Sequence, residues 1–312
     1  MRCLIIGGGA IGLLYGAKLA IGGSQAYVCT RTASQAAILR EAGIELAAQG
    51  TIRRVEVEAE AAEHIIGDRL RFFAAEAVLL TVKQYQLTGQ LLDCLERAVL
   101  PGTPVYCLQN GIGHLELLRG ALPQLTFRAA VTTDGALRTG LNAVKHTGAG
   151  ELWLEAADSN LNETERQKML VSTMKKAGIA VFLSKQMKDR MYRKLLLNSV
   201  INPLTALYGV KNGELPEAPD RLAHMKLLYD ETAAILHAAG MELRGDEWEQ
   251  VLALCRLTAD NESSMLRDVR SGRQTEIDWI NGGVAALARR LGLTAPHNEE
   301  ITARIAPPVS DR

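Results

Sequence analysis

The sequence lacks the features that mark several large classes of protein. Its 35 basic and 35 acidic residues give a formal net charge of zero, whereas nucleic-acid proteins and polybasic membrane binders carry a clustered excess of Lys and Arg. No apolar run approaches the roughly 20 residues that a membrane-spanning helix needs, and residues 1–7 are too short for the apolar part of a signal peptide. We therefore expect a soluble cytoplasmic protein without nucleic-acid or membrane partners.

The sequence also offers little for disulfide or metal chemistry. Its five cysteines show no Cys-x-x-Cys spacing, and its six histidines show no metal-ligand spacing. We interpret the cysteines as small buried hydrophobic residues in a reducing compartment, and we expect no disulfide framework and no metal site. They are Cys3, Cys29, Cys94, Cys107 and Cys255.

A glycine motif stands at the start of the chain. Residues 3–6 are apolar and predict a buried parallel strand, and residues 13–21 have a helical pattern. Between them, Gly7, Gly9 and Gly12 fit G-x-G-x-x-G, in which the first glycine allows a tight turn, the second a close approach of pyrophosphate, and the third close helix–strand packing. This context predicts dinucleotide binding. The predicted loop comprises Gly7, Gly8, Gly9, Ala10, Ile11 and Gly12.

The end of the second predicted strand, residues 26–31, favours one of the two nicotinamide cofactors. An NAD-binding unit usually has an acidic residue there for the ribose 2′-hydroxyl, but this chain has Thr30 and Arg31. A cation at that position suits the 2′-phosphate of NADP. We therefore predict NADP(H), with Arg31 at the 2′-phosphate; the alternative is a surface arginine that begins the next turn.

Further buried strands, at residues 76–82 and 105–108, predict a doubly wound sheet. Lys83 and Asn110 follow them, so their side chains are expected at the carboxyl edge of the sheet, where such folds bind ligands. The remaining elements are expected as a helix and turn at 34–50, an exposed antiparallel strand or hairpin at 52–60, a hairpin region at 128–154 and a strand at 179–183.

The strand pattern stops near residue 184, and the sequence reads as helical from residue 186. We expect an α/β fold: a Rossmann-type doubly wound sheet at residues 1–184, which binds NADP, followed by an all-α domain at residues 185–312, which holds substrate. The helical domain could also be a dimer surface, so a monomer and a homodimer both remain open.

A polar stripe opens the helical domain. Lys194, Asn198 and Asn202 recur every four residues and so share one helix face, while nearly every other residue from 195 to 204 is apolar. A helix that is apolar on almost all sides is buried, and buried amides and ammonium groups need partners. The stripe is therefore either an internal hydrogen-bond network or the wall of a ligand site. Pro203 predicts that the helix ends or kinks near Asn202.

These motifs, in this order, resemble the ketopantoate reductase (2-dehydropantoate 2-reductase) family over nearly the whole chain. The most specific is Lys-x-x-x-Asn-x-x-x-Asn-Pro. The sequence departs from the family pattern at Tyr85 and at Asp134-Gly135. The motifs are GGGAIG at 7–12, Arg31, Lys83 with Gln86, Asn110-Gly111, RKLLLNSVINPLTAL at 193–207, NGEL at 212–215, SSM at 263–265, TEID at 275–278 with Asn281-Gly282, and Gly292 with PHN at 296–298.

The resemblance implies a role for each matching residue. Lys194 would be the general acid, Asn110 would lie between cofactor and substrate, and Glu276 would lie beside the nicotinamide. The remaining cofactor contacts would be Arg31, Lys83 beside the nicotinamide ribose, and the backbone of Ala136. The remaining substrate contacts would be Asn198, Asn202, Asn212 and Ser264, the last at the carboxylate.

The implied reaction is NADPH-dependent reduction of 2-dehydropantoate, a small 2-oxo acid, to pantoate, the precursor of pantothenate. Lys194 would stabilise the charge that develops on the carbonyl oxygen and donate a proton to it. Two alternatives remain: an NADP-dependent reductase of another 2-oxo acid or an opine-type dehydrogenase, and a non-catalytic NADP sensor. The intact polar stripe argues against the sensor, which needs no acid catalyst.

Overall fold

The computed structural model describes residues 1–62, 73–157 and 161–305. The chain divides into two compact units. The first unit comprises Met1–Gln109 and His114–Met187. The second comprises Asn110–Gly113 and Lys188–Arg312, so a four-residue segment of the N-terminal half packs with the C-terminal half.

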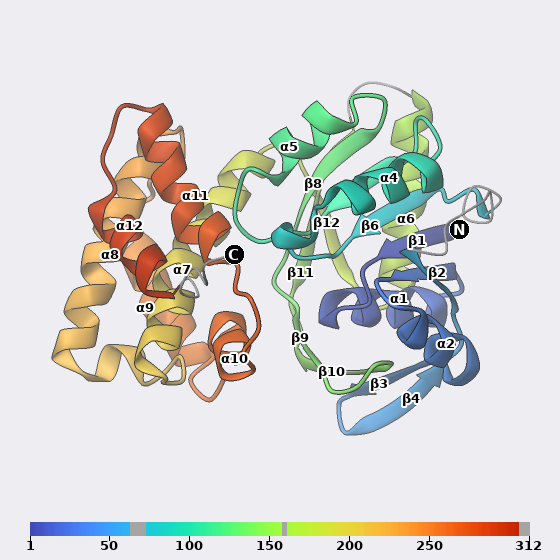
Figure 1. Cartoon of the computed structure of the whole chain (residues 1–312), viewed down its shortest axis with the longest axis horizontal. Helices are drawn as coiled ribbons and strands as arrows, with labels where there is room; N and C mark the ends of the chain where they lie inside the picture. The colour runs from blue at the N-terminus through green and yellow to red at the C-terminus, as the bar shows by residue number, and fades with distance from the viewer. Residues whose placement is uncertain (63–72, 158–160, 306–312) are drawn as a thin grey trace. The chain divides into compact units, whose positions relative to one another are not determined.

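The first unit is built on an eight-stranded sheet of order β12-β11-β8-β7-β6-β1-β2-β5 (Figure 1). Neighbouring strands are parallel except for β8 and β11. The predicted parallel sheet is thus confirmed, and the carboxyl ends of β1, β2 and β6 lie at one edge. The strands are β1 (Arg2–Ile6), β2 (Gln25–Thr30), β5 (Glu58–Ala61), β6 (Ala77–Leu80), β7 (Pro104–Cys107), β8 (Thr126–Thr132), β11 (Glu151–Glu155) and β12 (Ala180–Ser184).

Helices cover the sheet because the central strands are apolar on both faces. Cys3 and Ile5 of β1 share a core with Tyr15 of α1 and Leu170 of α6, while the alternate residue Leu4 is fully buried on the other face. The first unit's helices are α1 (Ala10–Ile21), α2 (Ala33–Ala42), α4 (Gly89–Ala98), α5 (His114–Ala121), α6 (Leu161–Lys176) and the 3₁₀ turn η2 (Gln84–Gln86).

A second, four-stranded sheet of order β4-β3-β10-β9 packs against α1. The expectation of a helix and turn over 34–50 is wrong for its second half. The helix α2 ends at its C-cap Gly43, which has a φ of +68°, and Ile44 begins a strand where a turn was expected. The second sheet also divides residues 52–60, since β4 joins the small sheet whereas β5 joins the large one. The strands are β3 (Ile44–Ala48), β4 (Thr51–Val55), β9 (Gly135–Arg138) and β10 (Ala143–Gly148).

In the described residues of the second unit all regular structure is helical (Figure 1). Leu196 of α7 packs in one core with Val284 of α11, and Leu204 packs in another with Leu228 of α8. Across the described residues no helix is long and apolar enough to cross a membrane. The helices are α7 (Met187–Tyr208), η3 (Leu215–Glu217), α8 (Pro219–Ala238), α9 (Glu247–Leu257), α10 (Ser264–Arg270), α11 (Ile277–Arg290) and α12 (Pro296–Ile305).

The central helix α7 does not end at Asn202. It passes through Pro203 and continues to Tyr208. Burial of Val200, Ile201 and Leu204 against neighbouring helices holds this turn in helical form, so tertiary packing overrides the local effect of proline.

Candidate active site

The glycine loop joins β1 to the N-terminus of α1 in the first unit. Gly7 has a φ of +118°, which favours glycine. A Cβ on Gly12 would lie 1.8 Å from the Gly7 carbonyl oxygen, so only glycine fits there. By contrast, no atom lies within 4 Å of a Cβ built on Gly9, the N-cap of α1. The loop therefore leaves space over Gly9, at a helix N-terminus that attracts anions.

Three side chains that the sequence analysis missed hold this loop. Thr81 Oγ1 donates to the Gly7 carbonyl at 3.0 Å. Gln35 Nε2 donates to the carbonyls of Gly8 at 2.8 Å and Leu141 at 2.7 Å. Arg138 Nη1 lies 3.3 Å from the same Gly8 oxygen. No local motif marks these residues, because their partners lie far away in the sequence.

Two of the predicted cofactor contacts lie at the ends of the strands that flank β1. Arg31 is exposed between the end of β2 and Thr32, the N-cap of α2, so its guanidinium is accessible to an anion. Lys83 follows β6, and its backbone N–H donates to Gln86 Oε1 at 2.9 Å. This hydrogen bond caps the 3₁₀ turn at Gln84–Gln86, which explains the Lys-x-x-Gln spacing.

A buried acid orders the approach to β9, the strand that carries Ala136. Asp134 accepts hydrogen bonds from the Tyr15 hydroxyl at 2.9 Å, His146 Nε2 at 2.9 Å and the Gly150 N–H at 3.1 Å. Burial alone would raise the pKa of Asp134, but the hydrogen bond to His146 and the charge of Lys18 hold it below its usual value. Asp134, one of the departures from the family pattern, therefore has hydrogen-bond partners within the first unit for both of its carboxylate oxygens.

The polar stripe on α7 occupies the second unit. Lys194, Asn198 and Asn202 are half-buried, and within the described residues their side chains make no hydrogen bond. Burial lowers the pKa of Lys194 from 10.5 to about 8, although the charge of Glu276 opposes that shift. Half-buried polar groups without protein partners favour a ligand site over an internal network.

Glu276 and Asn110 meet within the second unit. Glu276, the N-cap of α11, is only 6% exposed, and its Oε2 accepts from Asn110 Nδ2 at 3.2 Å. The Ile112 N–H donates to the Trp279 carbonyl at 3.2 Å. Gly111 has a φ of +81°, and a Cβ there would lie 2.3 Å from the same carbonyl oxygen. The conformation of this segment thus requires glycine beside Asn110.

The other two predicted substrate contacts differ in environment. Asn212 is 8% exposed and donates through Nδ2 to Thr258 Oγ1 at 2.9 Å, while its buried Oδ1 has no partner among the described residues. Ser264 is exposed at the first position of α10, and the N-cap role belongs to Ser263, whose Oγ accepts from the Leu266 N–H at 3.0 Å. Asn212 therefore retains an acceptor, and Ser264 a free hydroxyl.

The predicted residues fall into two sets. The glycine loop, Arg31, Lys83 and Ala136 belong to the first unit. Lys194, the three substrate asparagines, Ser264, Asn110 and Glu276 belong to the second. The second set includes Glu276, which the resemblance places beside the nicotinamide, and Asn110, which it places between cofactor and substrate.

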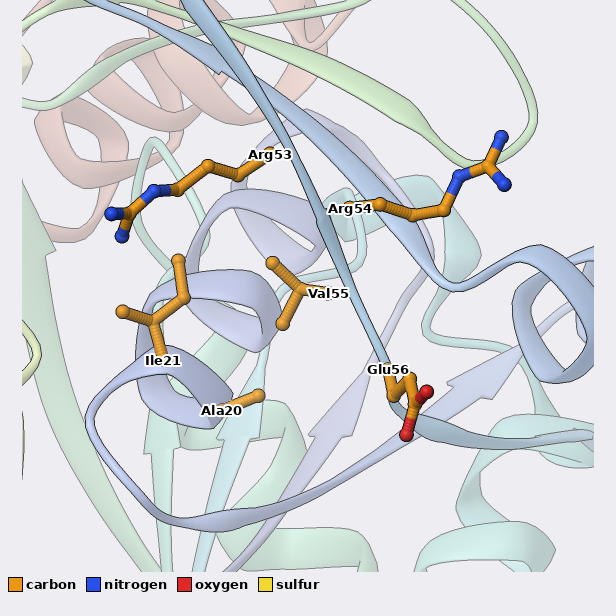
Figure 2. A pocket seen from close by; sticks show the side chains of 6 residues that line it. All are labelled: Ala20, Ile21, Arg53, Arg54, Val55 and Glu56. Atoms are coloured by element: carbon orange, nitrogen blue, oxygen red, sulfur yellow. The ribbon is translucent and has the colours of Figure 1, made fainter.

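Two other features of the described residues stand apart from this chemistry. No group of three or more His, Cys, Asp or Glu side chains could hold a metal ion in the parts of the chain that the structure describes. An open pocket lies between the end of α1 and β4, where Arg53 and Arg54 point to opposite sides of the strand (Figure 2). It contains none of the predicted site residues.

A glycine loop on a parallel sheet, joined to a helical unit with a lysine of lowered pKa, defines a dinucleotide-dependent oxidoreductase. The family model for ketopantoate reductase PanE/ApbA matches residues 3–159, and the model for its C-terminal part matches residues 186–307. The chain belongs to the ketopantoate reductase family.

Individual relatives match along almost their whole length. The 2-dehydropantoate 2-reductase of Bacillus subtilis is 36% identical over 96% of this chain and 94% of its own. A crystal structure of panE from Bacillus subtilis is 35% identical, covers 98% of this chain and 99% of its own, and gives a TM-score of 0.80. A PanE/ApbA family ketopantoate reductase from Ralstonia eutropha is 26% identical, with coverages of 98% and 97% and a TM-score of 0.86.

Proposed function

We propose that this protein reduces 2-dehydropantoate to pantoate with NADPH, a step of pantothenate biosynthesis. The observation that carries the proposal is the unpartnered Lys194–Asn198–Asn202 stripe with its lysine of lowered pKa. The 2-dehydropantoate 2-reductase of Bacillus subtilis, 36% identical to this chain, indicates which 2-oxo acid to test.

The first unit would hold the cofactor, which supplies the hydride. The N–H groups at the start of α1 and the space over Gly9 suit the pyrophosphate. Exposed Arg31 suits the 2′-phosphate, and one charge-assisted contact of this kind contributes about 1.5–3 kcal/mol. Lys83 and the backbone of Ala136 would complete the contacts from this unit, with Asn110 and Glu276 contributing from the second.

Lys194 would supply the proton. As the carbonyl carbon becomes tetrahedral, its oxygen gains negative charge, which an adjacent ammonium group stabilises and then protonates. A pKa of about 8 leaves Lys194 mostly protonated at neutral pH while making it a stronger acid than an ordinary lysine. Glu276 would keep the pKa from falling further, since its carboxylate favours the ammonium form.

The amides of Asn198, Asn202 and Asn212 would orient the substrate, and the Ser264 hydroxyl would donate to its carboxylate. 2-Dehydropantoate carries a hydroxyl that simple branched 2-oxo acids lack, and an asparagine amide can pair with such a group. The 36% identity to the 2-dehydropantoate 2-reductase of Bacillus subtilis favours 2-dehydropantoate over another 2-oxo acid.

The test is NADPH oxidation with a panel of 2-oxo acids, run with and without an amine co-substrate. We expect the highest kcat/KM with 2-dehydropantoate. A higher value for another 2-oxo acid would identify a different reductase, and dependence on the amine would identify an opine dehydrogenase. Tight NADPH binding without any turnover would identify a sensor. Light scattering on the same sample distinguishes a monomer from a homodimer.

A further inference from the structure

The central helix of the second unit contains a proline at a position where its backbone bond is needed. Pro203 has no N–H, so it cannot donate to the carbonyl of Ser199 four residues earlier. Ser199 is 0% exposed, so water cannot take the place of that donor. Leaving this acceptor unpaired would be costly in the interior of the unit.

Asn281 of α11 supplies the missing donor. Its Nδ2 lies 2.9 Å from the Ser199 carbonyl oxygen and 2.9 Å from Asn298 Oδ1, and Asn281 is itself 0% exposed. One amide group therefore replaces the helical bond lost at Pro203 and joins α7 to α12.

The far end of this connection is anchored by a carboxylate. Glu231 Oε1 accepts from both the backbone N–H and Nδ2 of Asn298 at 2.8 Å, and its Oε2 accepts from the His297 N–H at 3.0 Å. Asn298 Nδ2 also donates to Thr232 Oγ1 at 3.1 Å. The donor of Asn281 is thus held by a chain of contacts that begins on α8.

The bridged turn of α7 is the one that carries the stripe. Asn198 precedes Ser199, and Asn202 precedes Pro203, so both ends of the broken backbone bond adjoin a predicted substrate contact. We propose that Asn281 is a positioning residue for substrate: its bond to the Ser199 carbonyl fixes the turn that presents Asn198 and Asn202. The kinetic part of this proposal rests on the proposed function.

The test is a double-mutant cycle with Asn281→Ala, Pro203→Ala and the double variant, measuring KM and kcat for 2-dehydropantoate, Kd for NADPH and Tm. The Pro203→Ala substitution restores the backbone N–H, so it should rescue the loss of Asn281. An unsatisfied buried acceptor costs about 10- to 100-fold in the folding equilibrium. Because the turn that carries Asn198 and Asn202 can shift to relieve that cost, we expect Asn281→Ala to raise KM about tenfold. The double variant should recover to within about threefold of the wild type.

Two comparisons separate positioning from general damage. NADPH binding should change less than about twofold, since most of the proposed cofactor contacts, namely the glycine loop, Arg31 and Lys83, belong to the first unit. Arg290→Ala, an exposed position on the same helix α11, should leave KM within about twofold of the wild type. An unchanged KM in Asn281→Ala, or a double variant as impaired as Asn281→Ala, would overturn the proposal.

The Tm values of the four proteins in this cycle do not depend on which substrate the enzyme uses. If Asn281→Ala does not fold, the double variant is expected to fold and unfold cooperatively; failure of both would contradict the rescue. If the wild type binds NADPH but does not reduce 2-dehydropantoate, the proposed function fails, whereas recovery of Tm in the double variant still supports the bond between Asn281 and Ser199.

Discussion

Lys194 is the residue on which the proposed chemistry depends most. Replacing it with alanine removes the acid and should lower kcat by about 10²- to 10⁴-fold. NADPH affinity should be retained, because the glycine loop and Arg31 belong to the other unit. Steady-state kinetics and a fluorescence titration with NADPH measure the two effects. Lys188→Ala, an exposed position at the start of the same helix, is the control, and near-normal turnover in Lys194→Ala would reject the acid assignment.

The lowered pKa of Lys194 predicts the pH dependence of the reaction. The acid works only when protonated, so kcat/KM for reduction should be level below pH 8 and fall about tenfold per unit above it. Glu276→Gln removes the charge that favours the ammonium form and should move this fall to lower pH. A profile that is flat through pH 8, or a fall that moves to higher pH in the variant, would contradict this electrostatic account.

At the residue scale, the sequence predicts what short motifs encode. The four-residue spacing of Lys194, Asn198 and Asn202 is enough to place them on one helix face. Short motifs do not reveal the contacts of Gln35 and Asn281, because each bonds to a carbonyl that is distant in the chain, although Asn281 stands in a family motif. The spacing of the stripe also could not show whether it is an internal network or a ligand site, because that distinction depends on which hydrogen bonds its side chains make.

Among the elements, the glycine loop before α1 should give one variant that affects stability and another that affects only NADPH binding. Gly12→Ala places a methyl group against the Gly7 carbonyl and should destabilise the fold by about 1–3 kcal/mol. Gly9→Ala meets no atom within 4 Å, so it should keep the wild-type Tm while its methyl group fills the space proposed for pyrophosphate. Thermal unfolding and NADPH titration test the pair, and full NADPH affinity in Gly9→Ala would place the cofactor elsewhere.

The turn between β2 and α2 should set the choice of cofactor. Arg31→Ala loses one charge-assisted contact, so NADPH affinity should fall about 10- to 100-fold while NADH affinity changes little. Arg53→Ala, an exposed arginine of the same unit on β4, controls for general loss of charge (Figure 2). Equal losses for both cofactors would mean that Arg31 does not read the 2′-phosphate.

Elements whose burial is uniform were the easiest to predict. The apolar strands β1, β6 and β7 and the glycine turn follow directly from the sequence. Within the small sheet, β4 lies in the predicted exposed antiparallel strand. Strand β3 was missed because it combines alternating residues with a helix-like composition, and its partner β10 lies about a hundred residues later. Of the two outcomes expected near Asn202, an end or a kink of α7, the end was wrong because packing and the Asn281 amide compensate for the proline.

In the whole molecule, the proposed cofactor and proton-donor functions belong to different units. The two units follow each other in the sequence except at Asn110–Gly113. This segment follows β7 of the first unit, yet it packs with α11 of the second unit through Trp279. Sequence periodicity indicates the change from strands to helices, but it cannot show that four residues of the first half belong with the second. That assignment depends on contacts such as the one between Asn110 and Glu276.

The most direct test of the account is the rate of NADPH oxidation by the purified protein with 2-dehydropantoate, repeated with NADH. We expect rapid oxidation of NADPH and a much lower kcat/KM with NADH. No oxidation of NADPH by a sample that binds it tightly would contradict the proposed reaction, and equal rates with both cofactors would contradict the role of Arg31.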